Sequence, residues 1–504
     1  MNAQTRRDFL RRVGAGAVAA GVGSGLASDL GLSKVLAQDE PRLTFGAMEP
    51  LVSLLQETPI AKLQPMLVNK LREGTTLKEL TAAAALANAR TFGGEDYIGF
   101  HSMFAFKPAY QMAQDLPEER RALPVLKALY RNTERIHAFG GRAKEVLRPV
   151  EASGSGDGEA VRDDIRGKDL KSAEAKYAAF RRDPAALLNQ AQAALRDSTE
   201  VHRVNMVYRA WGLLDLVGLE HAHTLLRQSL HYFAVAEKNQ KMDHFNGPRT
   251  VLPKLIDQHK LFEKPLGTKT FDDARLEAVS VELFQAAPER AAEIAAALLA
   301  EGTSPDAIHE AIGLAANQLV LRDENKQAHG ATVGVHACDA VNAWKHIGAA
   351  SDAKNAAAAV VMAAWNFAFD RDNPARNKMK EWEAYPRADA RERVKSSDPA
   401  ELLRELDGAI RAKDQALATA VAQRYGSLGA PESPVLALYR GFVVSQNGSL
   451  HGEKFFGTVS EEFARGRTPF RWRQLVAMAR FAASMYGEPT PGYEEATRLL
   501  GLPS

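Results

Sequence analysis

Residues 75–91 read TTLKELTAAAALANART, and this stretch decides the fold class. A polar start is followed by leucines and alanines at three- and four-residue spacing, the pattern of a helix with a buried face. Similar runs recur at 203–230, 305–321 and 470–486. Alternating strand patterns are scarce, and β-branched residues are sparse beside alanine. The sequence therefore predicts one all-α domain over residues 38–504, long enough to bury a large core.

The helix start recurs along the chain, which predicts internal repetition. It reads TTLKEL at 75–80, DPAALL at 183–188, SPDAI at 304–308 and DPAELL at 398–403. Three of the four place a capping residue before proline, as helix N-termini favour. A histidine follows each start: His101, His221, His336 and His451. Separations of 120, 115 and 115 residues between these histidines predict four diverged helical units, stacked as a solenoid or closed as a toroid. The alternative is that these segments resemble one another by chance, as segments of alanine-rich helical chains often do.

Three of the four units continue in a similar way after the histidine. A polar turn leads to an apolar helix expected at 122–130, 356–369 and 470–485. The His221 unit fits less well, because its helix is expected to run on to Gln240. Two stretches should interrupt the helices, a flexible loop near 151–165 and a charged connection near 371–398.

The N-terminus carries the pattern of a twin-arginine export signal. Arg6 and Arg7 precede a weakly apolar run from Val13 to Ala27. Small residues before Gln38 resemble a cleavage site, and Gly-Leu-Ala at 25–27 is the alternative. We expect a signal peptide at 1–37, the twin-arginine (Tat) export machinery as a partner, and a periplasmic or secreted mature protein. No later stretch offers eighteen consecutive apolar residues, so we expect no stable membrane span. The alternative is a basic N-terminus that contains the arginine pair by chance.

The charge balance excludes one class of partner. Of 64 Lys and Arg and 62 Asp and Glu residues, the segment 1–37 holds 5 and 2, which leaves 59 and 60. A near-neutral surface lacks the positive field that nucleic-acid binding requires. We therefore expect no nucleic-acid partner.

Cysteine content and missing motifs narrow the chemistry. Cys338 is the single cysteine, so iron–sulfur clusters, c-type haem and thiolate zinc sites are excluded, and any metal must be held by nitrogen and oxygen. Hydrolase, kinase, dinucleotide-binding and zinc-protease signatures are absent. Catalytic and cofactor-binding residues are therefore not assigned by motif.

The histidines are the remaining candidates for a site. Imidazole binds iron, copper and zinc, and a ring of helices that each present one histidine would collect such ligands. His101, His221, His336 and His451 are the predicted metal ligands. The secondary candidates are His223, His329, Glu220 and Asp339. For any one histidine on an apolar helix, a hydrogen-bonded core residue is the alternative. Without a pattern to promote them, we expect structural or surface roles for His137, His202, His231, His244, His259, His309 and His346.

Three histidine-bearing segments carry a resemblance. They read GEDYIGFH at 94–101, GLEHAHTLLR at 218–227 and HGATVGVHA at 329–337. These resemble stretches of twin-arginine-exported, all-helical bacterial proteins. The spread of histidine-bearing helices also resembles the questin oxidase-like family of helical oxygenases. The resemblance to the questin oxidase-like family implies oxidation of a small organic substrate, but it assigns no catalytic residue in this chain. The export signal departs from the cytoplasmic setting of that family.

Two functions are therefore expected as alternatives. The first is an exported oxidoreductase with a histidine-bound metal or cofactor and a small-molecule substrate. The second is a helical repeat scaffold that binds a peptide, glycan or protein without catalysis, its histidines being core residues.

Overall fold

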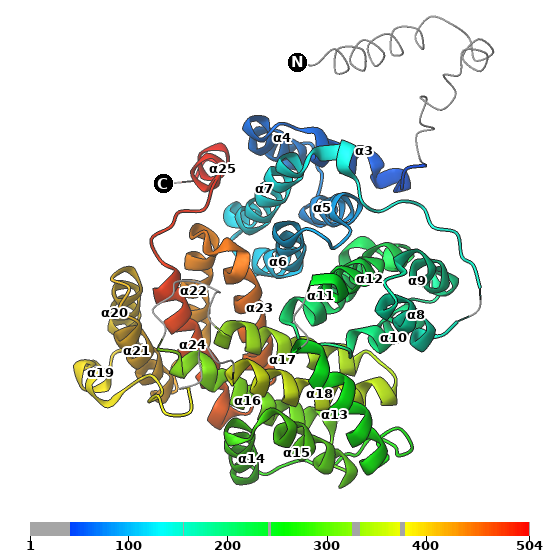
Figure 1. Ribbon diagram of the computed structural model, residues 1–504. Coiled ribbons are helices and arrows are strands. Elements are labelled where there is room, and N and C mark those ends of the chain that lie inside the picture. The colour runs from blue at the N-terminus through cyan, green and yellow to red at the C-terminus, as the bar shows by residue number, and fades with distance from the viewer. Residues whose placement is uncertain (1–40, 155, 240–242, 325–332, 373–378, 503–504) are drawn as a thin grey trace, which may run out of the picture. The chain divides into compact units, whose positions relative to one another are not determined.

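The computed structural model describes residues 41–502 apart from 155, 240–242, 325–332 and 373–378. The chain divides into two units, Met1–Thr44 and Phe45–Ser504. The expected signal peptide at 1–37, with Arg6 and Arg7, lies outside the described residues. All helices named below belong to the second unit (Figure 1).

The prediction of an all-α fold is confirmed. Within the described residues there are 23 α-helices and no sheet, and two isolated bridges are the only β-type pairings. The helices are α3 (Glu49–Glu57), α4 (Ile60–Arg72), α5 (Leu77–Phe92), α6 (Tyr97–Gln114), α7 (Ala122–Phe139), α8 (Gly158–Arg166), α9 (Leu170–Tyr177), α10 (Pro184–Leu195), α11 (Val201–Val217), α12 (Ala222–Asn239), α13 (Asp243–His259), α14 (Asp273–Gln285), α15 (Pro288–Ala300), α16 (Pro305–Arg322), α17 (Val333–Ala349), α18 (Ala353–Arg371), α19 (Ala388–Arg393), α20 (Pro399–Arg411), α21 (Gln415–Ser427), α22 (Glu432–Ser445), α23 (His451–Arg465), α24 (Thr468–Met485) and α25 (Tyr493–Leu499). In the part of the chain that the structure covers, no helix has both the length and the apolar character to cross a bilayer.

The four predicted helix starts are N-caps in the structure. Thr76 forms a reciprocal capping box with Glu79 at the start of α5. The other three caps are Asp183 on α10, Ser304 on α16 and Asp398 on α20, each followed by proline at the first helical position. Each side-chain oxygen accepts from a backbone N–H that the helix leaves unpaired, which is why the sequence alone locates these starts.

Four helices form the centre of this unit. α6 packs against α11, α11 against α17, α17 against α23, and α23 against α6, so the contacts close into a ring. Figure 1 shows the four together in the middle of the second unit, although they come from widely separated parts of the chain. Each also packs against the helix that follows it: α7, α12, α18 and α24. This recurring helix pair agrees with the predicted repetition.

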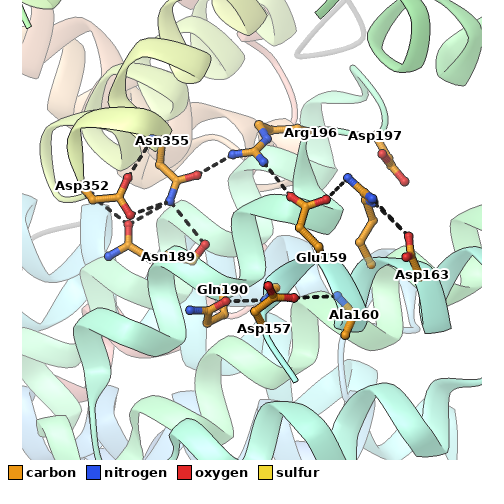
Figure 2. A network of polar contacts seen from close by, with 12 residues as sticks. Asp157, Glu159, Ala160, Asp163, Asn189, Gln190, Arg196, Asp197, Asp352 and Asn355 are labelled. Atoms are coloured by element: carbon orange, nitrogen blue, oxygen red, sulfur yellow. Dashed lines mark hydrogen bonds and ion pairs between the residues drawn. The ribbon is translucent and has the colours of Figure 1, made fainter. Parts of the chain in front are cut away.

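A polar network joins α8 and α10 to the start of α18 (Figure 2). The Asn189 side chain accepts from Asp352 N and Asn355 Nδ2, both at 3.0 Å. Arg196 donates to Asn355 at 2.5 Å and to Glu159 at 3.3 Å. The bonds to Asp352 and Asn355 link segments 159 to 166 residues apart and hold together the helices that flank α11 and α17.

Helices extend into both segments that were expected to be non-helical, the loop near 151–165 and the connection near 371–398. α8 begins at Gly158, so the segment without helix near 151–165 ends at Asp157. α19 (Ala388–Arg393) lies within 371–398, and residues 373–378 are outside the described part.

Candidate functional site

Four histidine rings meet where the central helices begin. The ring centroids of His101 and His202 are 4.9 Å apart, those of His101 and His451 5.2 Å, those of His202 and His336 5.7 Å, and those of His336 and His451 5.4 Å. We call these four residues the histidine cluster. Three predicted ligands, His101, His336 and His451, are therefore brought together.

The fourth member is His202, and the structure places the predicted His221 elsewhere. His221 ends the short 3₁₀ helix Leu219–His221, where its ring contacts Phe45 edge-on with centroids 5.8 Å apart. In the second of the four predicted helical repeats, the histidine that joins the cluster therefore lies one helix earlier than the one that the spacing predicts. His202 is the second residue of α11 and closely follows the N-cap of this helix, Glu200.

All four imidazoles lie near the N-terminal ends of the four central helices. His101 is the fifth residue of α6, His202 the second of α11, His336 the fourth of α17 and His451 the first of α23. The four helices therefore run in the same direction from the cluster. Their N-terminal ends carry partial positive charge, which favours neutral over protonated imidazole.

Hydrogen bonds fix which ring nitrogens face the cluster. His101 Nδ1 donates to the Tyr97 carbonyl at 2.6 Å, and His202 Nδ1 pairs with Glu200 Oε1. Nδ1 must carry the proton where its partner is a carbonyl or a carboxylate. The Nε2 atoms of His101 and His202 are buried without a hydrogen-bond partner among the described residues. His336 Nε2 and His451 Nε2 lie 3.4 Å apart.

Burial keeps two histidines of the cluster, His101 and His451, uncharged. His101 and His202 are only 5% and 7% exposed. Burial lowers the pKa of His101 and of His451 well below the ordinary histidine value, and the nearby Lys454 lowers both further. These two imidazoles are therefore neutral at pH 7 and have lone pairs to offer a ligand.

Charged groups surround the cluster at close range. Burial lowers the pKa of Lys454 to about 8. Burial would raise the pKa of Glu200, but the adjacent His202 outweighs it and holds the value at about 2. Asp339, a predicted secondary candidate, is buried one turn beyond His336 and accepts from Thr458 Oγ1 at 2.8 Å. Burial raises the Asp339 pKa, against the effect of Lys454.

Polar residues continue along the inner faces of three central helices. Successive positions three or four residues apart lie on the same side of an α-helix. On α11 these positions hold His202, Asn205 and Arg209; on α17, His336, Asp339 and Asn342; on α23, His451, Lys454 and Thr458. Beyond the histidines, all of these residues are buried. Burying polar groups opposes folding, so these residues are part of the candidate site. We call the nine residues the polar axis.

A pocket of about 470 Å³ opens beside the cluster. His101 and His451 line it together with Tyr97, Ile98, Ser102, Arg131, Glu134, Arg135, Ala138, Ser449 and Leu450. Ser449 and Leu450 adopt left-handed backbone conformations, with φ of 48° and 64°, immediately before His451. Non-glycine residues in this region are strained, and such strain is often found at functional sites. The conformation of Ser449 and Leu450 determines where α23 begins and therefore where His451 lies.

The secondary candidates other than Asp339 do not join the cluster. His223, on α12, packs near Tyr177 of α9, with ring centroids 5.9 Å apart, and burial lowers the pKa of His223 to about 4. Glu220 is exposed in the same short 3₁₀ helix as His221. His329 lies outside the described residues, so its candidacy as a metal ligand stays a prediction.

As the side chains stand, the described residues include no group of three or more His, Cys, Asp or Glu arranged to hold a metal ion. Metal binding at the cluster would require the rings to turn toward a common point. Comparison with protein-family models, with curated proteins and with solved structures gave no match to this chain.

Proposed function

We propose that this chain is an exported oxidoreductase that holds a transition metal on the histidine cluster and acts on a small organic substrate. One observation carries the proposal. Four imidazoles from four separate helices meet in a buried space, and the Nε2 atoms of His101 and His202 have no other described partner there. Buried polar atoms are nearly always paired in proteins, so unpaired nitrogens indicate a missing ligand.

The donor set fits a transition metal. Neutral imidazole suits iron, copper and zinc, whereas calcium and magnesium prefer oxygen. Two nitrogens bound to one tetrahedral metal at about 2.0–2.1 Å stand about 3.4 Å apart. The 3.4 Å between His336 Nε2 and His451 Nε2 matches that spacing. His101 and His202 would complete the set if their rings turned toward the same point.

The surrounding groups suit the same role. A metal-binding histidine usually donates its second ring nitrogen to a carboxylate or carbonyl, which fixes the ring and strengthens the ligand. Glu200 accepts this bond from His202, and the Tyr97 carbonyl accepts it from His101. Glu200 also supplies negative charge near the cluster.

The adjacent pocket gives the substrate class. Its volume of about 470 Å³ suits a small organic molecule, and Tyr97, Ile98 and Leu450 provide apolar wall. A metal bound by His101 and His451 would face this pocket, because both residues line it. A redox-active metal such as iron or copper would supply the electron transfer that oxidation needs.

Metal content tests the proposal. We expect protein purified from the periplasm, the location proposed from Arg6 and Arg7, to carry about one transition metal per chain by elemental analysis. His202→Ala and His451→Ala should each lose most of this metal while helicity by circular dichroism survives. His221→Ala is the matched control and should retain the metal.

Two outcomes would contradict the proposal. A folded, colourless wild-type protein without metal would favour the helical scaffold instead. Equal metal loss in the His221 and His202 variants would show that the bound metal lies outside the histidine cluster.

A further inference from the structure

The opposite ends of the four central helices surround a second pocket of about 380 Å³. All four helices contribute to it: Lys107 and Gln111 from α6; Tyr208, Arg209, Trp211, Gly212 and Asp215 from α11; His346 and Ala349 from α17; and Glu461 and Arg465 from α23. The polar axis described above thus runs from the histidine cluster toward this pocket.

Arg209 is the unusual residue of the second pocket. It is 3% exposed, and its Nε and Nη2 atoms have no hydrogen-bond partner among the described residues. These two nitrogens form one edge of the guanidinium group, the edge that binds a carboxylate through two parallel hydrogen bonds. The face of the group is covered by Tyr208, whose ring centroid is 4.6 Å from Arg209 Cζ.

The acidic residues of the pocket are already engaged. Glu461 accepts from Tyr208 Oη at 2.9 Å and from Asn342 Nδ2 at 2.7 Å, and its Oε2 lies 3.2 Å from His346 Nε2. Asp215 pairs with Lys107. Among the described residues, the Arg209 edge therefore lacks a hydrogen-bonded carboxylate, and Arg465 adds a second positive charge where α23 ends.

We infer that the second pocket binds a small organic carboxylate, which Arg209 would hold by turning its buried Nε and Nη2 edge toward the pocket, with the carbon body of the ligand toward Trp211. A charge-assisted, bidentate pair in a buried place is stronger than the opposing effect of the helix C-terminal ends, whose partial charges are smaller and fall off within one turn. This inference is independent of whether the histidine cluster binds metal.

Titration calorimetry with benzoate tests the inference on the full-length chain. We expect one benzoate per chain, and at least tenfold weaker binding in Arg209→Gln and in Arg209→Lys, which keeps the charge but loses the two-pronged edge. Arg290→Gln, at an exposed arginine that lines neither pocket, is the matched control and should bind like the wild type.

A second variant covers the case in which Arg209→Gln does not fold. A Cβ added at Gly212 would meet only the Lys107 side chain, at 3.4 Å from its Cδ. Gly212→Leu should therefore fold, fill the pocket and abolish benzoate binding. The inference is overturned if wild-type protein binds no benzoate, if sulfate binds in preference to benzoate, or if Gly212→Leu binds benzoate as the wild type does.

Discussion

Glu200 connects local helix chemistry to the histidine cluster. Its carboxylate caps α11 by accepting from Arg203 N at 3.1 Å, and it also accepts from His202 Nδ1 and from Tyr232 Oη. One side chain thereby starts the helix and orients the imidazole that this helix carries. Because the Glu200 pKa is lowered from 4.5 to about 2, its contribution to stability is present above pH 4.5 and is lost as the pH falls toward 2.

Glu200→Gln should therefore weaken the proposed metal site more than the fold. The amide keeps the shape of the side chain but loses the charge that strengthens His202 as a ligand, and such changes lower metal affinity about 10- to 100-fold. Competition with a chelator measures this. Glu220→Gln, at an exposed position, should leave affinity unchanged, and an equal loss in both variants would contradict the role of Glu200.

His231 is held between two carboxylates from distant segments. Its Nδ1 lies 2.8 Å from Glu95 and its Nε2 lies 2.7 Å from Glu174. Burial lowers the His231 pKa, but the hydrogen bonds and charges of Glu174 and Glu95 outweigh burial, so the pKa is raised. A raised pKa adds stability that is fully present below pH 6.5 and is lost as the pH rises through the folded-state value.

His231→Gln should consequently destabilise the protein most in acid. We expect a loss of about 2 kcal/mol at pH 6, the scale of hydrogen bonds to charged groups, and a smaller loss at pH 9. Denaturant midpoints at both pH values measure the difference. A loss that does not shrink at pH 9 would show that His231 acts through packing rather than charge.

The candidate site is predictable from the sequence in part. Even spacing points to His101, His336 and His451, whereas it gives His202 no support. The signal of His202 is local: it closely follows a capping glutamate, and Asn205 and Arg209 continue a polar face along the helix. A similar polar face begins at His451. The polar inner face of its helix, rather than an even spacing between histidines, identifies His202 as the fourth member of the cluster.

At the scale of elements, helix starts are predictable and helix neighbours are not. The caps at Thr76, Asp183, Ser304 and Asp398 depend on contacts within one turn, which a sequence displays directly. The ring of α6, α11, α17 and α23 depends on contacts between segments about 100 residues or more apart, which a sequence does not display.

Gly334 shows how closely α17 must approach α16. A Cβ at Gly334 would lie 2.4 Å from Val320 N and 2.6 Å from Leu319 C. Gly334→Ala should therefore push α17 away, displace His336 two residues on, and cost about 1–3 kcal/mol, as overpacking does. Thermal and denaturant unfolding measure the cost.

Gly408 in α20 provides the matched control. A Cβ there meets nothing within 4 Å, so Gly408→Ala should stabilise the protein by about 0.5–1 kcal/mol through helix propensity. Equal effects of the two substitutions would contradict the close approach of α16 and α17.

At the scale of the second unit, the central helices join two pockets through a polar interior. The histidine cluster lies beside one pocket, and Arg209 lies in the other. Hydrophobic burial by the outer helices supplies the driving force for folding, which offsets the cost of the polar axis. Composition predicts the large helical core, but it does not reveal that a polar axis crosses it.

The most direct test of the central claim is the X-ray absorption spectrum of the metal-containing protein. If the four imidazoles share one metal, the spectrum will show three or four nitrogen ligands at about 2.0–2.2 Å with the outer-shell scattering of histidine rings, and His202→Ala will reduce that scattering while His221→Ala will not. An oxygen-dominated shell without imidazole scattering, or spectra unchanged in the His202 variant, would contradict the account.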